Sequence, residues 1–441
     1  LSRKVPRWSP CWSAGGVHQA VAVHHTIGRN QVKVGIRVLG PGSGTLGEYQ
    51  STKKHLDPRP PLVEGAALLI TNRYPSYENL YQNGFIASRI RNYQQEGTRV
   101  VVFCLNPGIQ ELEFREFEGT QVLTGPQEVL EKLVSQSEYG NILVHFLSPE
   151  MKEVLDKAPS NKKIIVWIHG FEAQPWWRRA ILYTDVVSVE KAKKQSEIRM
   201  AFWERVISTC PSNWHFVFVS QWLAKTFFFD IGLNLERAKY SVIHNLVDTE
   251  KYIYRPKGIE QRFKVLSIRP FASKIYANDL SVAAVKWLSE NYDDFDKFEF
   301  SFYGDGPLFD ETVEPILNLD NVQVFRKFLS QSDIARIHAE YGVFLVPSRM
   351  DTQGVSRGEA MSSGLVPVTT DAAAIPEFVD TKSGLMVEQE NPIALAKALI
   401  KLAEDPGLFS ELSRGAANRV REQLSATETT LQEISLIEES I

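Results

Sequence analysis

The apolar residues of the chain gather in short runs, separated by longer stretches with one apolar face. From about residue 65 onward these runs are four to seven residues long and rich in Val, Ile and Phe, which is typical of buried parallel strands. We predict strands at Ala66–Thr71, Arg99–Cys104, Asn141–Phe146, Lys163–Ile168, Trp214–Ser220, Phe263–Ile268, Phe298–Tyr303, Asn321–Phe325, Val343–Val346, Val366–Thr369 and Gly384–Val387.

Helical stretches alternate with these strands. One runs over Gly84–Gln95 and is ended by Gly97. Another opens with the N-cap Asn391 and with Pro392 at the first helical position, and continues to about Ala403. Such alternation predicts doubly wound α/β domains, in which ligands bind at the carboxyl ends of the strands.

The strands form two series that meet near Arg255–Gln261. We therefore expect two Rossmann-like domains facing across a cleft, an N-terminal one over 65–254 and a C-terminal one over 255–425. Residues 426–441 are expected to form a C-terminal helix or tail. The cleft between the two domains is the expected site.

The first 64 residues differ from the rest, with nine Lys or Arg against three Asp or Glu. Apolar residues alternate from Val17 to Val23 and from Val32 to Val38, which indicates two strands. We expect a small β appendage, or the tail of a preceding module. The alternative is that its basic excess helps to hold an anionic polymer or a membrane surface.

Composition places the chain among globular proteins of a reducing compartment. Of its 441 residues 43% are hydrophobic and 23% charged, and the net charge is −4, so no nucleic-acid partner is expected. Its three cysteines suggest neither a disulfide framework nor a zinc site. No apolar run approaches the roughly 18 residues of a membrane span. Because the sequence begins at Leu1, we expect a truncated or processed chain, and the sequence leaves open whether further domains precede it.

One stretch of aromatic residues bears on localisation. Trp176, Trp177, Phe202 and Trp203 stand among basic residues, which fits either the packing of a solvated helix or contact with an anionic membrane surface. We expect a cytoplasmic protein, with peripheral contact at the inner face of the membrane as the alternative.

The segment Val343–Asp380 carries the most informative chemistry. A predicted strand is followed by a loop with Asp351 and by a short helix from Gly354 to Ser363, stopped by Gly364. Backbone N–H groups at that helix start, those of Gly354, Val355 and Ser356, suit a phosphate. Asp351 and Glu359 flank it and can accept from sugar and ribose hydroxyls. The alternative is a capping acid and a solvated glutamate on an ordinary crossover.

This segment resembles the Glu-x7-Glu signature of the family-4 retaining glycosyltransferases, which have the GT-B fold. The match runs from Asp351 through Glu359 to Val368, with Asp in place of the first Glu. Three further motifs of that family occur in the same order: Val242–Asp248, Ser267–Pro270 with Lys274, and Phe302–Pro307. The resemblance covers about residues 65–425 and is to the bacterial surface-polysaccharide type.

The resemblance implies a role for particular residues. Arg269 and Lys274 would bind the donor diphosphate, Glu359 the ribose and Asp351 the hydroxyls of the donor sugar. His169, at the end of a strand facing the cleft, would contact the donor sugar at the reacting centre. Cofactor-binding positions would further include Gly84, Gly306, Lys327, Leu329, Gly354, Val355 and Ser356.

The expected function is transfer of a sugar, with retention of configuration, from a nucleotide-diphosphate donor to a glycan or lipid-linked glycan acceptor. No metal and no other cofactor is expected. The alternatives are an epimerase or phosphorylase of the same fold, and a glycan-binding relative without activity. Asp294-Phe295-Asp296 resembles the metal-binding motif of another glycosyltransferase fold, but it follows a predicted helix end, where a solvated turn is favoured.

Overall fold

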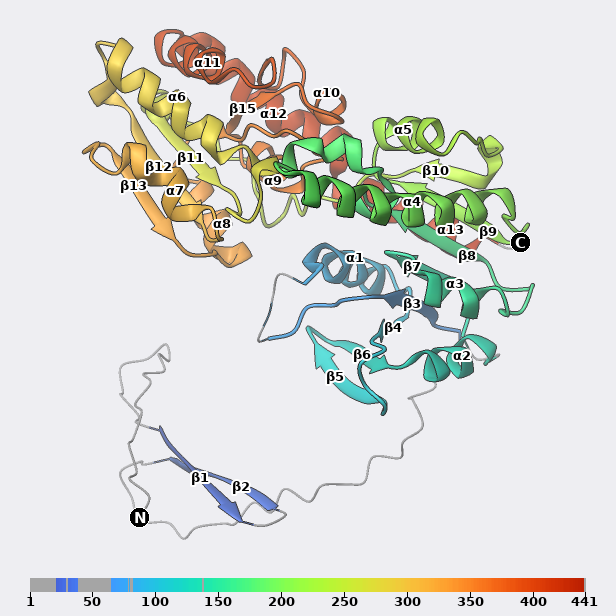
Figure 1. Cartoon of the computed structure of the whole chain (residues 1–441). Helices are drawn as coiled ribbons and strands as arrows, with labels where there is room; N and C mark the ends of the chain where they lie inside the picture. Colours follow the sequence, from blue (N-terminus) through green and yellow to red (C-terminus); the bar gives the residue numbers. More distant parts are fainter. Residues whose placement is uncertain are drawn as a thin grey trace. The chain divides into compact units, whose positions relative to one another are not determined.

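The structure is a computed structural model that describes residues 21–28, 31–38, 65–77, 79, 82–136 and 139–439 (Figure 1). It contains two compact units, Leu1–Pro60 and Pro61–Ile441. In the first, strands β1 (Val21–Gly28) and β2 (Gln31–Val38) pair antiparallel. The strand predicted up to Val38 is confirmed, and the start of the earlier one, from Val17 to 20, lies outside the described residues.

The second unit begins with an eight-stranded sheet in the order β10-β9-β8-β7-β3-β4-β6-β5. All neighbours are parallel except β5 and β6. Its strands are β3 (Ala67–Thr71), β4 (Val100–Leu105), β5 (Glu113–Phe117), β6 (Thr120–Gly125), β7 (Ile142–His145), β8 (Ile164–Ile168), β9 (Trp214–Phe218) and β10 (Tyr240–Val242).

A six-stranded parallel sheet follows in the order β13-β12-β11-β14-β15-β16. Its strands are β11 (Lys264–Ile268), β12 (Glu299–Gly304), β13 (Val322–Arg326), β14 (Val343–Leu345), β15 (Val366–Thr370) and β16 (Leu385–Val387). This order reverses between β11 and β14, and the loops after those strands define the crevice where such sheets bind ligands.

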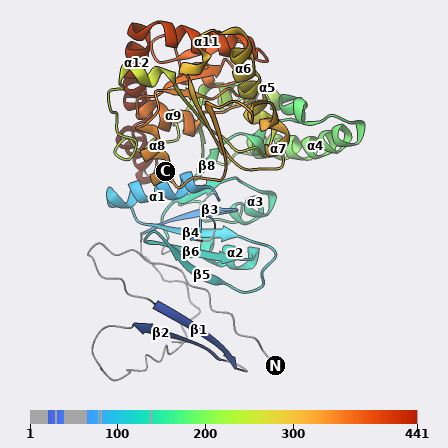
Figure 2. The same cartoon turned by 90° about the vertical axis from the view of Figure 1, so that its left-hand side faces the viewer.

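Helices lie between the strands and cover both sheets (Figure 1, Figure 2). The α-helices are α1 (Gly84–Gln95), α2 (Gln127–Ser135), α3 (Pro149–Leu155), α4 (Val186–Ser208), α5 (Gln221–Ile231), α6 (Asn278–Asn291), α7 (Phe309–Val313), α8 (Gln331–His338), α9 (Val355–Ser362), α10 (Ile375–Phe378), α11 (Pro392–Glu404), α12 (Pro406–Leu424) and α13 (Ala426–Glu438). The 3-10 helices are η1 (Phe171–Ala173), η2 (Trp176–Leu182), η3 (Arg237–Lys239), η4 (Ile259–Phe263), η5 (Lys274–Tyr276), η6 (Phe295–Lys297) and η7 (Glu314–Ile316).

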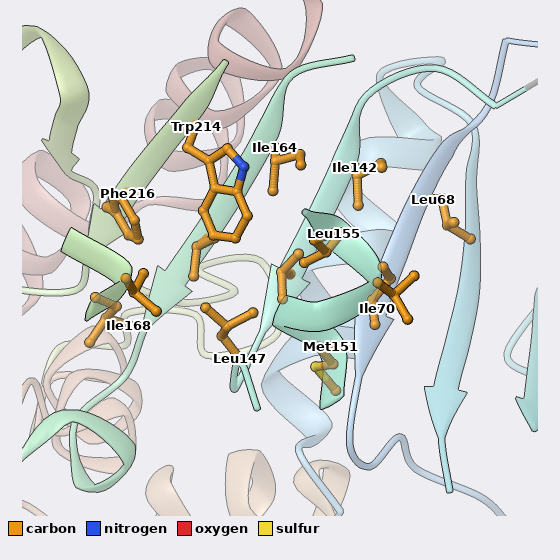
Figure 3. Packing of buried hydrophobic residues seen from close by; sticks show 14 of the residues in the cluster. Leu68, Ile70, Ile142, Leu147, Met151, Leu155, Ile164, Ile168, Trp214 and Phe216 are labelled. Carbon is orange, nitrogen blue, oxygen red and sulfur yellow. The ribbon is translucent and has the colours of Figure 1, made fainter. Parts of the chain in front are cut away.

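Apolar residues from both faces of the N-terminal sheet are buried against these helices. Figure 3 shows side chains of β3, β7, β8 and β9 directed toward those of α3, among them Ile70, Ile142 and Met151. Of the aromatic stretch near α4, Trp203 is fully buried and belongs to this core, whereas Trp177 is 52% exposed. Packing therefore accounts for Trp203 and for Phe202, which is partly buried against the same core, but not for Trp177.

The hairpin β5–β6 and strand β10 were not predicted. The residues of β5 read Glu-Phe-Arg-Glu-Phe, and four of the five are not buried. An edge strand of this kind lacks the apolar run by which the other strands are recognised. Among the described residues, no helix combines the length and the apolar character needed to cross a membrane.

The last helix, α13, returns to the N-terminal sheet and is tied to it by a buried carboxylate. Glu433 is 0% exposed and forms a 2.8 Å ion pair with Arg89 of α1. Its carboxylate also accepts a 2.6 Å hydrogen bond from the Tyr93 hydroxyl. The indole N–H of Trp167 on β8 donates to the same carboxylate at 3.0 Å. Three side chains from two elements of the N-terminal domain, α1 and β8, therefore converge on one carboxylate from the end of the chain.

Replacing this carboxylate should destabilise the protein strongly. Glu433→Ala leaves the guanidinium of Arg89 buried without its partner, which costs about 3–5 kcal/mol in the free energy of unfolding. Urea unfolding followed by circular dichroism measures the change. The matched control is Glu422→Ala, at an exposed position of α12, which should leave the urea midpoint unchanged. Equal midpoints for the two variants would contradict the assigned role of Glu433.

Candidate active site

The loops after β11 and β14 meet at the reversal point of the C-terminal sheet, as the strand order requires. Arg269 directly follows β11, is 6% exposed, and donates from Nη2 to the hydroxyl of Ser348, which follows β14. Its Nε has no hydrogen-bond partner among the described residues. Burial lowers the pKa of Arg269, with the nearby Asp351 acting in the opposite direction. Arg269 therefore lies at the reversal point of the sheet, and its role at the diphosphate stays a prediction.

The glycine-containing turn after β12 packs against the Arg269 loop. A Cβ at Gly304 would stand 1.9 Å from the carbonyl oxygen of Arg269, and one at Gly306 would stand 2.4 Å from the carbonyl carbon of Phe271. Gly306 also has a φ of 150°. The close approach of the two loops thus explains both glycines, and Gly306 packs directly against the loop that carries Arg269.

Asp351 lies between two buried arginines. Its Oδ1 accepts from the backbone N–H of Gln353 at 3.1 Å, and its Oδ2 is 3.5 Å from Nη1 of Arg357. Arg357 is 1% exposed, and its Nε has no partner within the described part of the chain. Arg357 was not singled out from the sequence, because nothing in the local pattern shows that this helical side chain turns back toward the loop.

The start of α9 was predicted correctly. Gly354 is the N-cap residue, with a φ of 83°, and the helix begins at Val355 and continues through Ser356. A Cβ at Gly354 would be 2.6 Å from the guanidinium of Arg357. The predicted amide groups are therefore accompanied by a buried cation, which adds positive charge at this terminus.

Glu359 faces the segment that joins the two domains. The side chains of Tyr252, Lys251 and Asp248 lie near it. Burial raises the pKa of Glu359 to about 7, against the lowering effects of Tyr252 and Lys251. Its carboxylate can therefore gain or lose a proton near neutral pH.

His169, immediately after β8, is half-buried and paired with a second histidine. Its Nε2 is 2.9 Å from Nδ1 of His145, and the rings of Phe85 and Phe146 contact it. Burial, and to a smaller extent the charge of Arg89, holds the pKa of His169 well below its usual range. The imidazole is therefore neutral at pH 7, and its buried Nδ1 has no partner in the described region.

The His169 loop and the Asp351 loop touch each other. The hydroxyl of Thr352 donates to the carbonyl of His169 at 2.7 Å, and a Cβ at Gly170 would be 2.8 Å from the methyl group of Thr352. Gln353, which is 2% exposed, exchanges hydrogen bonds of 2.6 and 2.7 Å with the backbone of Asn245. Residues predicted separately in the two domains are thus brought together at one junction.

The remaining predicted residues lie around this junction without joining it. Lys274 is exposed at the start of η5, lines a pocket of about 330 Å³, and makes no ion pair within the described ranges. Lys327 is exposed with its ammonium 5.7 Å from the Tyr303 ring, and Leu329 is buried. Gly84 opens α1, and a Cβ there would meet nothing within 4 Å.

The aspartates of the rejected metal motif lie in a turn, as expected. Asp294 precedes η6 and forms a 2.8 Å ion pair with Lys297, and both side chains are more than half exposed. Within the part of the chain that the structure describes, no three His, Cys, Asp or Glu side chains gather in a way that could hold a metal ion.

Solved structures share this architecture along most of the chain. Sucrose-phosphate synthase from Thermosynechococcus elongatus superposes with a TM-score of 0.63 at 14% identity, covering 84% of this chain and 98% of that one. The Anabaena protein HepE, solved with UDP and glucose, gives a TM-score of 0.62 at 14% identity, covering 84% and 99%. The chain therefore has the GT-B fold of glycosyltransferases, as predicted.

Sequence comparison identifies the C-terminal domain more closely. Residues 264–405 match the sequence model of the family "Glycosyl transferases group 1". A D-inositol 3-phosphate glycosyltransferase of Streptomyces bingchenggensis is 31% identical over 103 residues, which is 23% of either chain. Sulfoquinovosyl transferase SQD2 of Arabidopsis thaliana is 29% identical over 135 residues, 30% of this chain and 26% of that one. The family match thus lies within the C-terminal domain, and the aligned segments span about a quarter of these relatives.

The raised pKa of Glu359 predicts that replacing its carboxylate with a neutral amide stabilises the fold at high pH. Between the usual glutamate pKa near 4.5 and about 7, the folded protein keeps a proton that the unfolded chain releases. The contribution of Glu359 to stability therefore falls as pH rises, and above pH 7 its charge is a cost. Glu359→Gln should be more stable than the wild type at pH 8 by about 1–3 kcal/mol, and little different at pH 5.

Urea unfolding at the two pH values tests this. Glu411→Gln, at an exposed position of α12, is the control and should show no pH-dependent difference from the wild type. A Glu359→Gln variant that is less stable than the wild type at pH 8 would show that the charged carboxylate stabilises the fold.

Proposed function

We propose that this protein is a retaining, metal-independent glycosyltransferase, which moves a sugar from a nucleotide-diphosphate donor to a glycan or lipid-linked glycan acceptor. The observation that carries the proposal is the junction at which Thr352 bonds to His169 beside Arg269 and Asp351. It joins a cationic site on the C-terminal domain to a strand end of the N-terminal domain. We place the reaction in the cytoplasm, in the synthesis of a surface polysaccharide such as capsule or O-antigen.

The leaving group explains the cations at the junction. As the bond between the anomeric carbon and the diphosphate oxygen breaks, its electron pair leaves with the diphosphate, where negative charge accumulates. Preorganised donors stabilise such charge most effectively in a site from which water is excluded. Arg269, with an unpartnered Nε, supplies these donors together with the N-terminus of α9. Lys274 would reach the diphosphate from the exposed side.

The donor sugar and ribose would be held by the two acidic residues. Asp351 would accept from sugar hydroxyls, and Glu359 from the ribose. An inverting enzyme needs a general base on the face opposite the leaving group. Here both carboxylates are assigned to the donor, so the acceptor oxygen would attack from the leaving-group face and its proton would pass to the departing phosphate oxygen. Configuration would then be retained.

The nucleotide would lie along the C-terminal sheet. Lys327 and Leu329, after β13, are assigned to the base, and Gly354, Val355 and Ser356 to the phosphates. On the other domain, Gly84 and the neutral His169 would face the donor sugar. Because HepE was solved with UDP, uridine diphosphate sugars are the first donors to test.

A donor screen tests the proposal directly. Purified protein is incubated with UDP-, GDP- and ADP-sugars, with and without a panel of monosaccharide and lipid-linked glycan acceptors. We expect release of nucleoside diphosphate that depends on the acceptor, together with a new glycoside. Release without transfer would indicate hydrolysis or epimerisation instead, and donor binding without turnover would indicate a glycan-binding relative.

Removing the buried guanidinium of the leaving-group site should slow turnover. Arg269→Ala deletes donors that act mainly as the glycosidic bond breaks, and we expect kcat to fall by about 10²–10³ at saturating donor, as for the loss of one oxyanion donor. Steady-state kinetics measure the change. The control is Arg414→Ala, at an exposed position of α12. A kcat for Arg269→Ala near that of the control would remove Arg269 from the site.

Activity should survive a chelator. If arginine and helix N–H groups stabilise the leaving diphosphate, excess EDTA should change the initial rate of transfer by less than about twofold. Loss of activity in EDTA with recovery in Mn²⁺ would contradict metal independence. Asp294→Asn would then show whether the exposed turn supplies a ligand.

A further inference from the structure

Two arginines of the N-terminal domain flank an exposed aromatic ring next to His169. Arg179 of η2 lies 5.1 Å from the centroid of the Phe171 ring, and Arg199 of α4 lies 4.9 Å from it. Phe171 is 53% exposed and stands two residues after His169. The two arginines therefore lie beside the segment that follows β8, which reaches the junction of the two domains.

A buried glutamine holds both guanidinium groups. Gln174 is 1% exposed; its Oε1 accepts from Nε of Arg179 at 3.1 Å, and its backbone carbonyl accepts from Nε of Arg199 at 2.8 Å. The terminal nitrogens of these two arginines make no ion pair within the described residues. The neighbouring Arg178, by contrast, is paired with Asp230 through both Nε and Nη2. Arg179 and Arg199 are thus held in place by Gln174, and the positive charge of each is without an ion-paired carboxylate among the described residues.

Glu172, a carboxylate close to both arginines, is already engaged. Its oxygen accepts from the backbone N–H of His169, and burial raises the pKa of its carboxyl group. Burial also lowers the pKa of Arg179 and of Arg199. Desolvated guanidinium groups without a paired anion are unfavourable, and a bound phosphate or carboxylate would relieve that cost.

The pair lies on the domain opposite the proposed donor residues. Arg269 and Arg357 lie on the C-terminal domain around Asp351, whereas Arg179 and Arg199 lie on the N-terminal domain beyond Gly170. The two sides approach where η2 contacts η5, with Tyr276 near Arg179. The Tyr276 ring also lies 5.1 Å from the guanidinium of Arg269, so an anion bound by Arg179 and Arg199 would lie next to the proposed donor site, on the N-terminal side of the cleft.

We propose that Arg179 and Arg199 bind an anionic group, a phosphate or a carboxylate, on the acceptor, with Phe171 contacting the adjoining sugar. This inference rests on the proposed function, because it assigns the N-terminal side of the cleft to the acceptor. It narrows the acceptor from any glycan to one that carries a negative charge close to the hydroxyl that is glycosylated.

The test uses the whole chain with its donor site filled. Isothermal titration calorimetry first finds which of UDP, GDP and ADP binds, and the protein is then saturated with it so that phosphate added later cannot occupy the donor site. Glucose 6-phosphate, glucuronate and neutral glucose are titrated next. Arg179→Gln and Arg199→Gln are compared with Arg205→Gln, an exposed position of α4 that removes the same charge.

We expect at least one anionic probe to bind the wild type ten or more times more tightly than glucose. Each of the Arg179 and Arg199 variants should lose most of that preference, and Arg205→Gln should keep it. Unchanged affinity for the nucleoside diphosphate shows that the variants are folded. Preference for glucose 6-phosphate would identify a phosphate on the acceptor, and preference for glucuronate a carboxylate.

Two results would overturn the inference while leaving the proposed function intact. These are equal affinity for anionic and neutral probes, and an anion preference that survives in both variants although the nucleoside diphosphate binds. If none of the three nucleoside diphosphates binds, the proposed function itself fails, and the assignment of these arginines to an acceptor fails with it.

Discussion

The carboxylate of Glu433 is neutralised inside the protein by Arg89, and the arrangement of both domains depends on that pair. Arg89 donates to Glu433 at 2.8 Å and is also 3.3 Å from the side-chain oxygen of Asn245, in the segment that leads to the C-terminal domain. The backbone of Asn245 is in turn bonded on both sides by Gln353. One buried network therefore runs from the last helix to the loop that carries Asp351.

This network makes the two halves of the site interdependent. Asp351 belongs to one domain and His169 to the other, and the hydrogen bond from Thr352 to the His169 carbonyl fixes their separation. Because the desolvation cost of a buried ion pair offsets much of its attraction, we infer that the Arg89–Glu433 pair acts here chiefly by aligning the two domains. Arg179 and Arg199, which donate to Gln174 in the segment after β8, lie beside the same junction.

Local pattern predicted the strands, the start of α9 and the loops that carry Arg269, His169 and Asp351, because burial and capping act over a few neighbouring residues. It did not predict the partners of those residues. Arg89 and Glu433 are 344 positions apart, and Arg357 is buried by a turn of its own side chain toward Gln353. Such pairs are brought together by the topology of the fold, and no local sequence pattern identifies either residue. The β5 edge strand was missed for the opposite reason, since its exposed charged residues conceal its periodicity.

Sugar transfer at this junction is expected to retain the anomeric configuration, and the stereochemistry of the product tests this most directly. Product from an α-linked nucleotide sugar is purified, and its anomeric proton is examined by NMR. Attack from the leaving-group face predicts an α linkage, with the small coupling constant of an axial–equatorial proton pair for a gluco-configured sugar. A β linkage from the same donor would require a base on the opposite face, and would contradict the roles given to Asp351, Glu359 and Arg269.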